Sequence, residues 1–222
     1  SKDVLEDAYI TCSSEILRVW REWERYSTTA VSAYVGPAVK IYLNTLERRL
    51  GDNGFKGNLL LMLSDGLVET LEYCIPRVVY LIGSGPAAAP AAARYAGNEM
   101  GLHNLLSIDM GGTSVDIGHI QNGEIPTTTE GWVQDERVAI KMIDVHSAGA
   151  GGGSIAWVDS LGLVRVGPQS AGSEPGPACY GRGGAEPTVT DADLILGYVP
   201  SDFFLGGEMT LDEERAREAV SS

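Results

Sequence analysis

The sequence predicts an α/β protein in which helices flank a mixed sheet. Apolar residues recur at helical spacing in the first quarter of the chain. Short apolar runs, each bounded by glycine, proline or polar turn residues, follow between residues 59 and 166 and are typical of strands. The chain has 222 residues, 44% of them hydrophobic, which is enough for one large domain or two small ones.

Two helices are expected before residue 51. Four apolar side chains share one face of a helix expected over residues 13–26: Ile16, Val19, Trp20 and Trp23. A second helix is expected over about residues 29–50, with Gly36-Pro37 as the place for a kink. The aromatic residues of this region are expected to pack in the core rather than to form a ligand platform: Trp20, Trp23, Tyr26 and Tyr34.

Five apolar runs predict strands, at residues 59–63, 78–82, 105–109, 114–120 and near 138–145. Asn122-Gly123 predicts a tight turn, and residues 155–158 and 163–166 predict a hairpin. Helices are expected over 87–96, after Pro90, and over 191–196 and 211–220, whereas residues 167–187 predict an ordered loop.

Charge and cysteine content exclude several classes of protein. A formal net charge of −14 is unfavourable for nucleic acid, so an anion site would have to use backbone N–H groups, helix N-termini or Mg2+. No apolar run approaches the ~20 residues that span a bilayer. Cys12, Cys74 and Cys179 form no CxxC pair, which favours a reducing cytoplasm. Cys12 and Cys74 are expected in the core, and Cys179 in a setting that suits an exposed thiol, with a nucleophilic role as an alternative.

The chain starts Ser1-Lys2-Asp3 without a methionine, so we expect it to be part of a longer protein.

The best-defined candidate site is the segment Asp109-Met110-Gly111-Gly112-Thr113-Ser114-Val115-Asp116, between two predicted strands. Glycines allow a tight turn, so the N–H groups of Gly112, Thr113 and Ser114 are expected to face phosphate oxygens. Asp109 and Asp116 are anions and would instead hold Mg2+ or orient an attacking water. The alternative is a Gly-Gly hairpin with two turn-forming aspartates. The segment matches neither a Walker A loop nor a dinucleotide fingerprint.

A second glycine-rich loop follows a histidine. Four glycines of this loop either contact substrate or nucleotide, or form a tight connection that only glycine permits: Gly149, Gly151, Gly152 and Gly153. His146 either has a catalytic or ligand role or is a hydrogen-bonded structural residue; Asp144 would share its face of a strand. His103 and His119 receive no role.

The loop from Asp109 to Asp116 resembles the phosphate loop of the actin, sugar-kinase and heat-shock-chaperone ATPase superfamily. The sequence around it resembles one branch, the hydantoinase A / 5-oxoprolinase family. The similarity covers nearly the whole chain and rests on six segments: Glu22–Pro37, Val145–Ala156, Arg165–Gly172, Pro175–Gly181, Pro187–Ala192 and Phe204–Gly207.

This resemblance implies a partial ribonuclease-H-like (actin-like ATPase) fold: a mainly helical connecting part over residues 1–75, and a lobe with the second phosphate loop over 76–222. It implies ATP and Mg2+ as cofactors and the ATP-dependent opening of a cyclic amide, such as a hydantoin or 5-oxoproline, through a phosphorylated intermediate. Residues Gly111–Ser114 would steady the phosphoryl group, with Asp109 and Asp116 at the metal.

Two other functions remain open under the resemblance. One is a subunit of an ATP-dependent ketone carboxylase acting on acetone or acetophenone. The other is a lobe or scaffold that is catalytically inert by itself. The resemblance also implies a hydantoinase B-type subunit or domain as partner, an oligomer, and a cytoplasmic location without nucleic acid or membrane.

Overall fold

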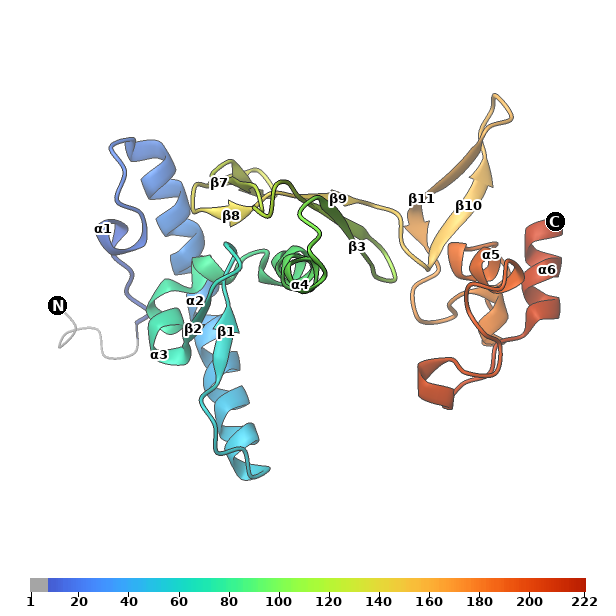
Figure 1. Cartoon of the computed structure of the whole chain (residues 1–222), viewed down its shortest axis with the longest axis horizontal. Coiled ribbons are helices and arrows are strands. Elements are labelled where there is room, and N and C mark those ends of the chain that lie inside the picture. Colours follow the sequence, from blue (N-terminus) through green and yellow to red (C-terminus); the bar gives the residue numbers. More distant parts are fainter. Residues whose placement is uncertain (1–7) are drawn as a thin grey trace. The chain divides into compact units, whose positions relative to one another are not determined.

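The computed structural model describes residues 8–222, which form two compact units. The first unit contains residues 8–107 and 118–145, and the second unit contains residues 108–117 and 146–222. Figure 1 labels most of the helices and strands, with numbers that follow the chain. The chain start, where the sequence lacks a methionine, lies outside the described residues.

The first unit is organised on α2 (Glu22–Asp52), a helix of 31 residues that contains Pro37. Before it comes only the short helix α1 (Ser13–Ile16). The predicted helix over 13–26 is therefore wrong, because the backbone is extended at Leu17 (φ −144°, ψ 111°) and at Arg21 (φ −77°, ψ 115°). The predicted second helix is confirmed, although it begins seven residues earlier than expected.

The aromatic residues near the start of α2 are not in the core. The exposed fractions are 97% for Trp20, 68% for Trp23, 57% for Tyr26 and 87% for Tyr34, so the prediction of core packing is wrong. The face that α2 buries instead consists mainly of small residues: Ser27, Thr28, Val31, Ser32, Gly36 and Leu43.

Small residues face inward because the backbone of another segment lies against the helix. Ser27 Oγ donates a hydrogen bond of 2.7 Å to the carbonyl of Arg137, in β7 (Glu136–Val138). Thr28 Oγ1 accepts from the amide of Ala139 at 3.0 Å and donates to the carbonyl of Glu24 at 2.6 Å. An aromatic side chain at either position would hold the two backbones apart.

The core of the first unit combines residues from four segments: Ile16, Val31, Val79, Val138 and Ile140. Val79 lies in η2 (Ile75–Leu81), a 3₁₀ helix, so the strand predicted over 78–82 is wrong. Pro76 at the start of η2 has the φ of a helical turn and lacks the amide that a strand would need. A short apolar run does not distinguish a buried strand from a buried helix, which explains the error.

The strand predicted over 59–63 is confirmed as β1 (Leu60–Met62), which pairs antiparallel with β2 (Val68–Thr70). A short helix, α3 (Leu71–Cys74), follows β2, and after η2 comes α4 (Ser84–Met100). The start of α4 lies before Pro90 rather than after it. Left-handed glycines flank α4 at both ends, Gly83 (φ 73°) and Gly101 (φ 69°), a conformation that favours glycine.

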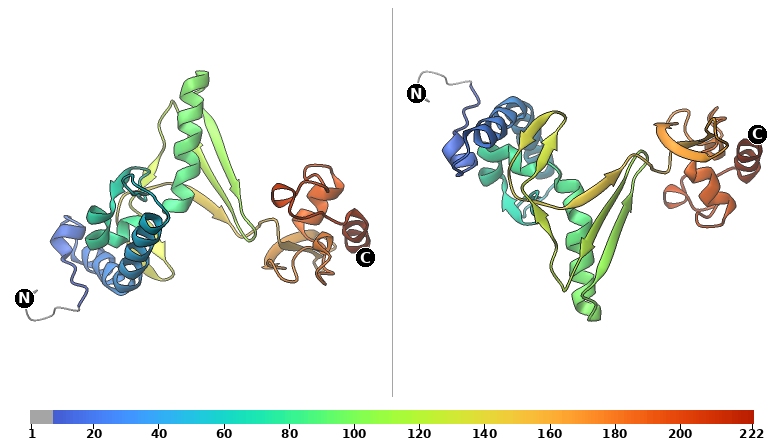
Figure 2. Two further views of the ribbon diagram at one scale, coloured as in Figure 1. Left: turned by 90° about the horizontal axis from the view of Figure 1, so that it is seen from below. Right: turned by 90° about the horizontal axis from the view of Figure 1, so that it is seen from above.

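Three strands that hold the candidate site form one sheet in the order β3–β4–β9: β3 (Leu105–Met110), β4 (Val115–Ile120) and β9 (Val145–Ala148). The strands predicted over 105–109 and 114–120 are thus confirmed. Figure 2 shows α4 beside the β3–β4 pair, and Pro90 of α4 lies directly against Gly118 of β4. A side chain larger than hydrogen at Gly118 would displace Pro90.

The single strand predicted near 138–145 is instead three short strands: β7, β8 (Met142–Ile143) and β9. β7 pairs with β6 (Gly131–Val133), and β8 pairs with β5 (Thr127–Thr128). The predicted turn is confirmed at Asn122 (φ 53°) and Gly123 (φ 79°), although it closes only the single bridge between Gln121 and Glu124.

The second unit contains the predicted hairpin, formed by β10 (Ser154–Val158) and β11 (Val164–Ser170). Two predicted helices are confirmed as α5 (Val189–Ile195) and α6 (Glu213–Ser221). The unit also contains two short 3₁₀ helices, η3 (Ala178–Tyr180) and η4 (Leu205–Gly207). The core of this unit is formed by Cys179, Leu194, Leu211 and Ala216. The chain is therefore a mixed α/β protein with several small sheets.

Within residues 8–222, every helix is too short or too polar to cross a bilayer.

Candidate functional site

The predicted phosphate loop is a tight turn whose amides are unpaired. The amide of Gly111 donates to the carbonyl of Ser114 at 2.9 Å, which closes the turn between β3 and β4. In the part of the chain that the structure describes, the amides of Gly112, Thr113 and Ser114 have no hydrogen-bond acceptor. Gly112 and Thr113 are exposed, so these amides are open to solvent or to a ligand, and three successive free donors in a turn are suited to an anion.

The carbonyls of this turn, in contrast, are held by the second glycine-rich loop. The amide of Gly152 donates to Gly111 O at 2.9 Å, and the amide of Gly153 donates to Gly112 O at 2.7 Å. A trans peptide holds its N–H opposite its C=O, so these two bonds also fix the direction of the amides of Gly112 and Thr113. The donors are therefore oriented before any ligand binds.

Close packing of the two loops explains why glycines are needed. A Cβ at Gly151 would lie 2.7 Å from Gly111 O, and one at Gly153 would lie 3.0 Å from Gly112 O. At Gly149 a Cβ would meet nothing within 4 Å. The tight-connection interpretation therefore accounts for Gly151 and Gly153, whereas Gly149 has no steric reason to be glycine.

Asp109 and Asp116 are opposite each other in the β3–β4 pair. The Gly111–Ser114 hydrogen bond sets the register, and a Cβ at Gly118 would lie 2.7 Å from Ser107 Oγ, which agrees with the same register. Side chains directly opposite in an antiparallel pair lie on one face, with Cβ atoms about 5 Å apart. Two carboxylates that share one face at this spacing are able to bind the same cation.

The carboxylate pair fits Mg2+ bound with a nucleotide better than a metal held by protein alone. Residues 8–222 contain no group of three or more His, Cys, Asp or Glu side chains that would hold a metal ion. Mg2+ usually keeps several waters and binds one or two carboxylates plus phosphate oxygens. Asp109 is exposed, and Asp116 is half-buried and accepts a short hydrogen bond from Ser147 Oγ.

Ser147 was not predicted as a site residue, whereas its neighbour His146 was. The side chain of His146 is exposed on β9, and it makes no hydrogen bond within the described residues. Strand alternation places Ser147 and His146 on opposite faces of β9. Only the pairing of β9 with β4, which the sequence does not reveal, brings Ser147 to Asp116.

A cavity of about 520 Å3 adjoins the predicted phosphate loop within the second unit. Its wall includes both glycine loops and residues from the C-terminal part of the unit: Met110, Gly111, Gly112, Thr113, Gly152, Gly153, Gly172, Ser173, Pro177, Tyr180, Thr190, Asp193 and Phe204. The rings of Tyr180 and Phe204 are 5.5 Å apart at an angle of 45°. The wall residues after Gly153 were not predicted as site residues. They are distant from the loop in sequence and reach the cavity only when the chain is folded.

Burial raises the pKa of the Tyr180 phenol, which therefore stays a neutral donor at physiological pH.

Cys179 is not an exposed thiol, and the nucleophile alternative fails with it. Its side chain is fully buried, and burial, together with the adjacent Asp191 carboxylate, raises its pKa to about 12. The thiol is thus protonated and inaccessible under ordinary conditions. Of the other two cysteines, Cys74 is buried as predicted, but Cys12 is exposed, so its predicted place in the core is wrong.

Asp191 is the most enclosed carboxylate of the second unit and was also not predicted as important. Its oxygens accept from Thr188 N (2.9 Å), Thr188 Oγ1 (2.7 Å) and Cys179 N (2.8 Å). Thr188 and Asp191 form a capping box at the start of α5. The spacing Thr-x-x-Asp before an apolar run was a readable signal for it. The role is structural: Asp191 ties α5 to the segment that carries Tyr180.

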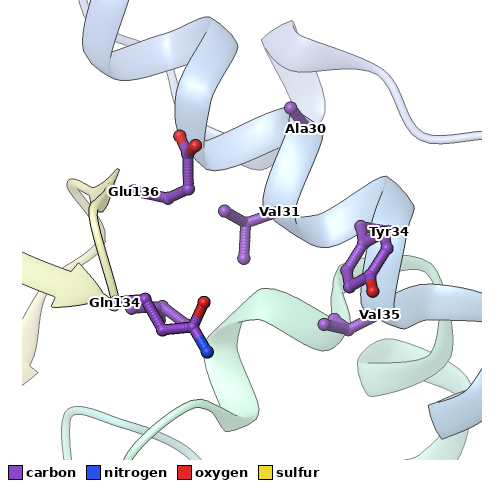
Figure 3. Close-up of a pocket in the computed structure, with 7 residues that line it drawn as sticks. Ala30, Val31, Tyr34, Val35, Gln134 and Glu136 are labelled. Atoms are coloured by element: carbon purple, nitrogen blue, oxygen red, sulfur yellow. The ribbon is translucent and has the colours of Figure 1, made fainter.

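The first unit has a cavity of about 400 Å3 between α2 and the β6–β7 turn. Figure 3 shows Gln134 of the turn and Glu136 of β7 on one side, and Val31 and Tyr34 of α2 on the other. The wall is mainly apolar and contains one carboxylate without a basic partner among its lining residues. This cavity therefore offers packing space but no arrangement of reactive groups.

Comparison with known proteins places the chain in a family. Residues 25–222 match the family described as Hydantoinase/oxoprolinase. The alpha subunit of caprolactamase from Pseudomonas jessenii is 38% identical over 218 residues, which is 98% of this chain and 31% of that protein. A 5-oxoprolinase from Arabidopsis thaliana is 35% identical over 200 residues, covering 88% of this chain and 15% of that protein.

Solved structures agree with this placement. The crystal structure of the ATP-dependent caprolactamase from Pseudomonas jessenii matches with a TM-score of 0.80 and 37% identity, covering 100% of this chain and 32% of that one. The nucleotide-free structure of an acetone carboxylase, described as acting by ATP-dependent carboxylation, matches with a TM-score of 0.76 and 27% identity, covering 94% and 29%. The chain spans about a third or less of these relatives, and it belongs to the hydantoinase/oxoprolinase family.

Proposed function

We propose that the protein containing this chain is an ATP-dependent hydrolase that opens a cyclic amide through a phosphorylated intermediate. In this proposal the chain supplies one phosphate-binding loop of a ribonuclease-H-like, actin-like ATPase fold. The observation that carries it is the set of three unpaired amides, of Gly112, Thr113 and Ser114, in a turn whose carbonyls are already held. The caprolactamase and 5-oxoprolinase names of its relatives support the same reaction class.

The chemistry explains why an amide hydrolase would need this loop. The amide oxygen attacks the terminal phosphorus of ATP, the bond from that phosphorus to the bridging oxygen breaks, and ADP leaves. The amide carbon becomes electrophilic, water adds to it, and the C–N bond breaks, which opens the ring and leaves an acyl phosphate. A second water then hydrolyses the acyl phosphate to a carboxylate and free phosphate. Oriented N–H donors stabilise the charge that develops on the transferred phosphoryl oxygens.

Asp109 and Asp116 are the residues that would hold Mg2+ in this scheme. The ion would neutralise phosphate charge near two carboxylates that otherwise repel both each other and the nucleotide. Ser147 keeps the carboxylate of Asp116 in place.

Replacing Asp109 by asparagine in the full-length protein tests the proposal. We expect substrate-dependent ATP turnover to fall at least 100-fold, because metal and phosphate positions are lost. Asp202→Asn, at an exposed aspartate outside the loop, is the matched control and should retain turnover. Unchanged turnover in Asp109→Asn would remove this residue from the mechanism.

The second candidate is a subunit of an ATP-dependent ketone carboxylase, favoured by the TM-score of 0.76 to acetone carboxylase. The two candidate functions are distinguished by the compounds that stimulate ATP turnover. Cyclic amides alone should stimulate a hydrolase, whereas a carboxylase needs a ketone and bicarbonate together. In both cases we propose a second subunit or domain of the hydantoinase B type, since the caprolactamase relative is itself named as a subunit.

A further inference from the structure

Resting on the proposed function, we propose that the cavity beside the phosphate loop binds an uncharged cyclic amide, with the carboxylate of Asp193 accepting the amide N–H. Tyr180 and Phe204 would then contact the apolar part of the ring. This assigns substrate contacts to three residues outside the predicted site, and it sets a preference among cyclic amides.

The geometry of phosphoryl transfer determines where the substrate must lie. The acceptor oxygen must lie about 3–3.5 Å from the terminal phosphorus before reaction. The terminal phosphate is expected at the amides of Gly112, Thr113 and Ser114, so the substrate must occupy space that adjoins this turn. The cavity of about 520 Å3 borders residues 110–113 and is large enough for a small ring. A nucleoside would lie two phosphates further from the reacting atoms.

The charge of the cavity wall selects the ligand. Among the described residues that line it there is no Lys, Arg or His, and Asp193 is the single carboxylate. The side chain of Asp193 is half-buried, and within residues 8–222 it has neither a hydrogen-bond donor nor a cationic partner. A half-buried carboxylate that receives no donor from the protein is available to accept an N–H from a ligand, and it disfavours a ligand that places negative charge beside it.

A lactam N–H meets this need better than the alternatives. A simple ketone such as acetone has no N–H to donate. 5-Oxoproline has the N–H but also a carboxylate, which Asp193 would repel. Pro177 and the Tyr180–Phe204 pair, with rings 5.5 Å apart, provide an apolar wall for ring methylenes.

The Asp193 contact would also strengthen during the reaction. When the amide oxygen is phosphorylated, positive charge develops on the ring nitrogen, and the N–H becomes a better donor to a carboxylate. An interaction that is stronger in the transition state than in the ground state raises kcat rather than lowering KM. Asp193 is thus expected to act mainly on kcat, and Phe204, which contacts the unreactive ring, mainly on KM.

The test uses the full-length protein with its partner subunit, ε-caprolactam and 5-oxoproline as probes, and calorimetry with Mg-ATP alone. We expect a kcat/KM at least tenfold higher for ε-caprolactam than for 5-oxoproline. Asp193→Asn should lower kcat for ε-caprolactam at least tenfold and leave the Kd of Mg-ATP within twofold, whereas Asp202→Asn should change neither. Phe204→Leu should raise KM several-fold and serves as a second variant if Asp193→Asn unfolds.

Three results would overturn the inference while the proposed function stands: a preference for 5-oxoproline, an unchanged kcat in Asp193→Asn, or weaker Mg-ATP binding in both variants with normal lactam kinetics. The last result would mean that the cavity holds the nucleoside. Absence of Mg-ATP binding by the unmodified protein would instead refute the proposed function itself, and the inference with it.

Discussion

Cys179 and Asp191 are buried side by side, and burial together with the carboxylate keeps the thiol protonated. Asp191 accepts a hydrogen bond from the amide of Cys179, and burial, followed by the Asp191 carboxylate, raises the pKa of the thiol to about 12. The same carboxylate caps α5 through Thr188. Removing it would leave several buried donors without an acceptor, so one substitution affects both the helix start and the thiol.

We therefore expect Asp191→Ala to lower the free energy of unfolding by about 3 kcal/mol, since hydrogen bonds to a charged acceptor are lost and their donors stay buried. Chemical denaturation measures this loss. Peptide mapping after iodoacetamide treatment should show Cys179 unmodified in the native protein and modified in Asp191→Ala. Rapid modification of Cys179 in the unmodified native protein would contradict the buried position.

Gly151 allows the second glycine-rich loop to lie on the phosphate loop. A Cβ there would lie 2.7 Å from Gly111 O, with backbone rather than a flexible side chain as the obstacle. We expect Gly151→Ala to destabilise the protein by about 1–3 kcal/mol and to shift the amides of Gly112 and Thr113.

Gly149→Ala is the matched control, because a Cβ at that position meets nothing within 4 Å. Thermal unfolding and Mg-ATP calorimetry on both full-length variants distinguish the roles of the two glycines. Gly151→Ala should lose Mg-ATP binding, and Gly149→Ala should retain it. Equal binding by the two variants would show that the contact between the loops does not orient the donors.

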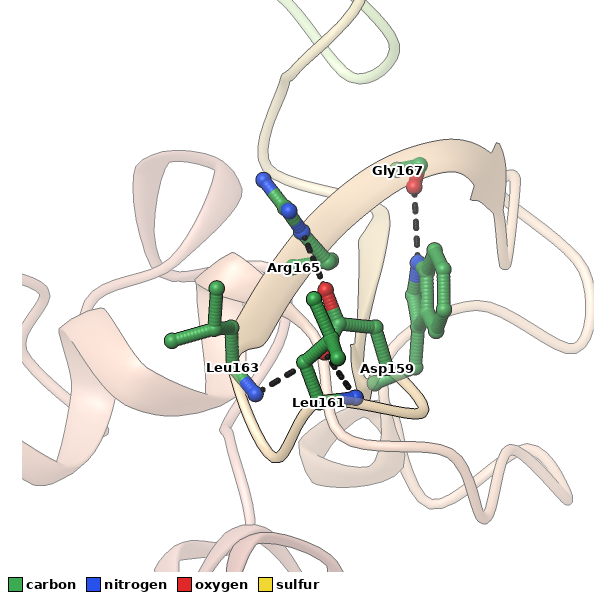
Figure 4. A network of polar contacts seen from close by, with 6 residues as sticks. Asp159, Leu161, Leu163, Arg165 and Gly167 are labelled. Atoms are coloured by element: carbon green, nitrogen blue, oxygen red, sulfur yellow. Dashed lines mark hydrogen bonds and ion pairs between the residues drawn. The ribbon is translucent and has the colours of Figure 1, made fainter.

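At the scale of elements, the tip of the β10–β11 hairpin is held by one side chain. Figure 4 shows Asp159 at the centre of the network, which accepts from the amides of Leu161 (2.9 Å) and Leu163 (3.0 Å) and from Arg165 Nε (2.9 Å). The Leu163 amide, then the Arg165 guanidinium, lower the pKa of this carboxyl below its ordinary value of 3.8.

Because the pKa of Asp159 is lowered in the folded state, the contribution of this residue to stability depends on pH in a defined direction. The stability from Asp159 is fully present above the ordinary carboxyl pKa and is lost as the pH falls through the lower folded-state value. Hydrogen exchange at Leu161 and Leu163 should be faster in Asp159→Ala than in the unmodified protein at neutral pH. At pH values below the folded-state pKa of Asp159, the exchange rates of the two proteins should become equal. A difference in rate that persists there would show that the charged carboxylate is not what protects these amides.

Elements with local signals were predictable, and those set by tertiary contacts were not. The β3–β4 hairpin and its loop followed from Gly111-Gly112 between alternating runs. The break at residues 17–21 and the helical η2 did not, because the first depends on what Ile16 packs against and the second on Pro76 within an apolar run.

The candidate site also has a part with a local sequence signal and a part that depends on tertiary contacts. The turn from Gly111 to Ser114 belongs to one continuous segment, so the sequence predicts its position between two strands, whereas its phosphate-binding role stays a prediction. Tyr180, Asp193 and Phe204 lie far along the chain from that loop and join one cavity only after folding. The pairing of Asp116 with Ser147 likewise depends on the order of strands in the sheet, which a single sequence does not encode locally.

At the scale of the whole molecule, the chain covers 31% of the caprolactamase subunit to which it is similar. It contains several exposed apolar side chains on β3, including Leu106 at 70% and Ile108 at 67%. Apolar strand residues exposed to this degree are usually covered in a complete protein. The isolated 222-residue chain is therefore expected to bind the hydrophobic dye ANS more strongly than the full-length protein, measured by fluorescence at equal molar concentration.

The number of free amide donors sets the expected nucleotide affinity of the isolated chain. Three amide donors, at about 1.5 kcal/mol each for a charged acceptor, provide about 4–5 kcal/mol, which corresponds to a Kd near 1 mM. The net charge of −14 opposes a polyanion and weakens binding further. We therefore expect no measurable heat when micromolar isolated chain is titrated with Mg-ATP, and saturable binding by the full-length protein under the same conditions. Micromolar binding by the isolated chain would mean that this loop and its neighbours form a complete nucleotide site, and that a second phosphate-binding segment is unnecessary.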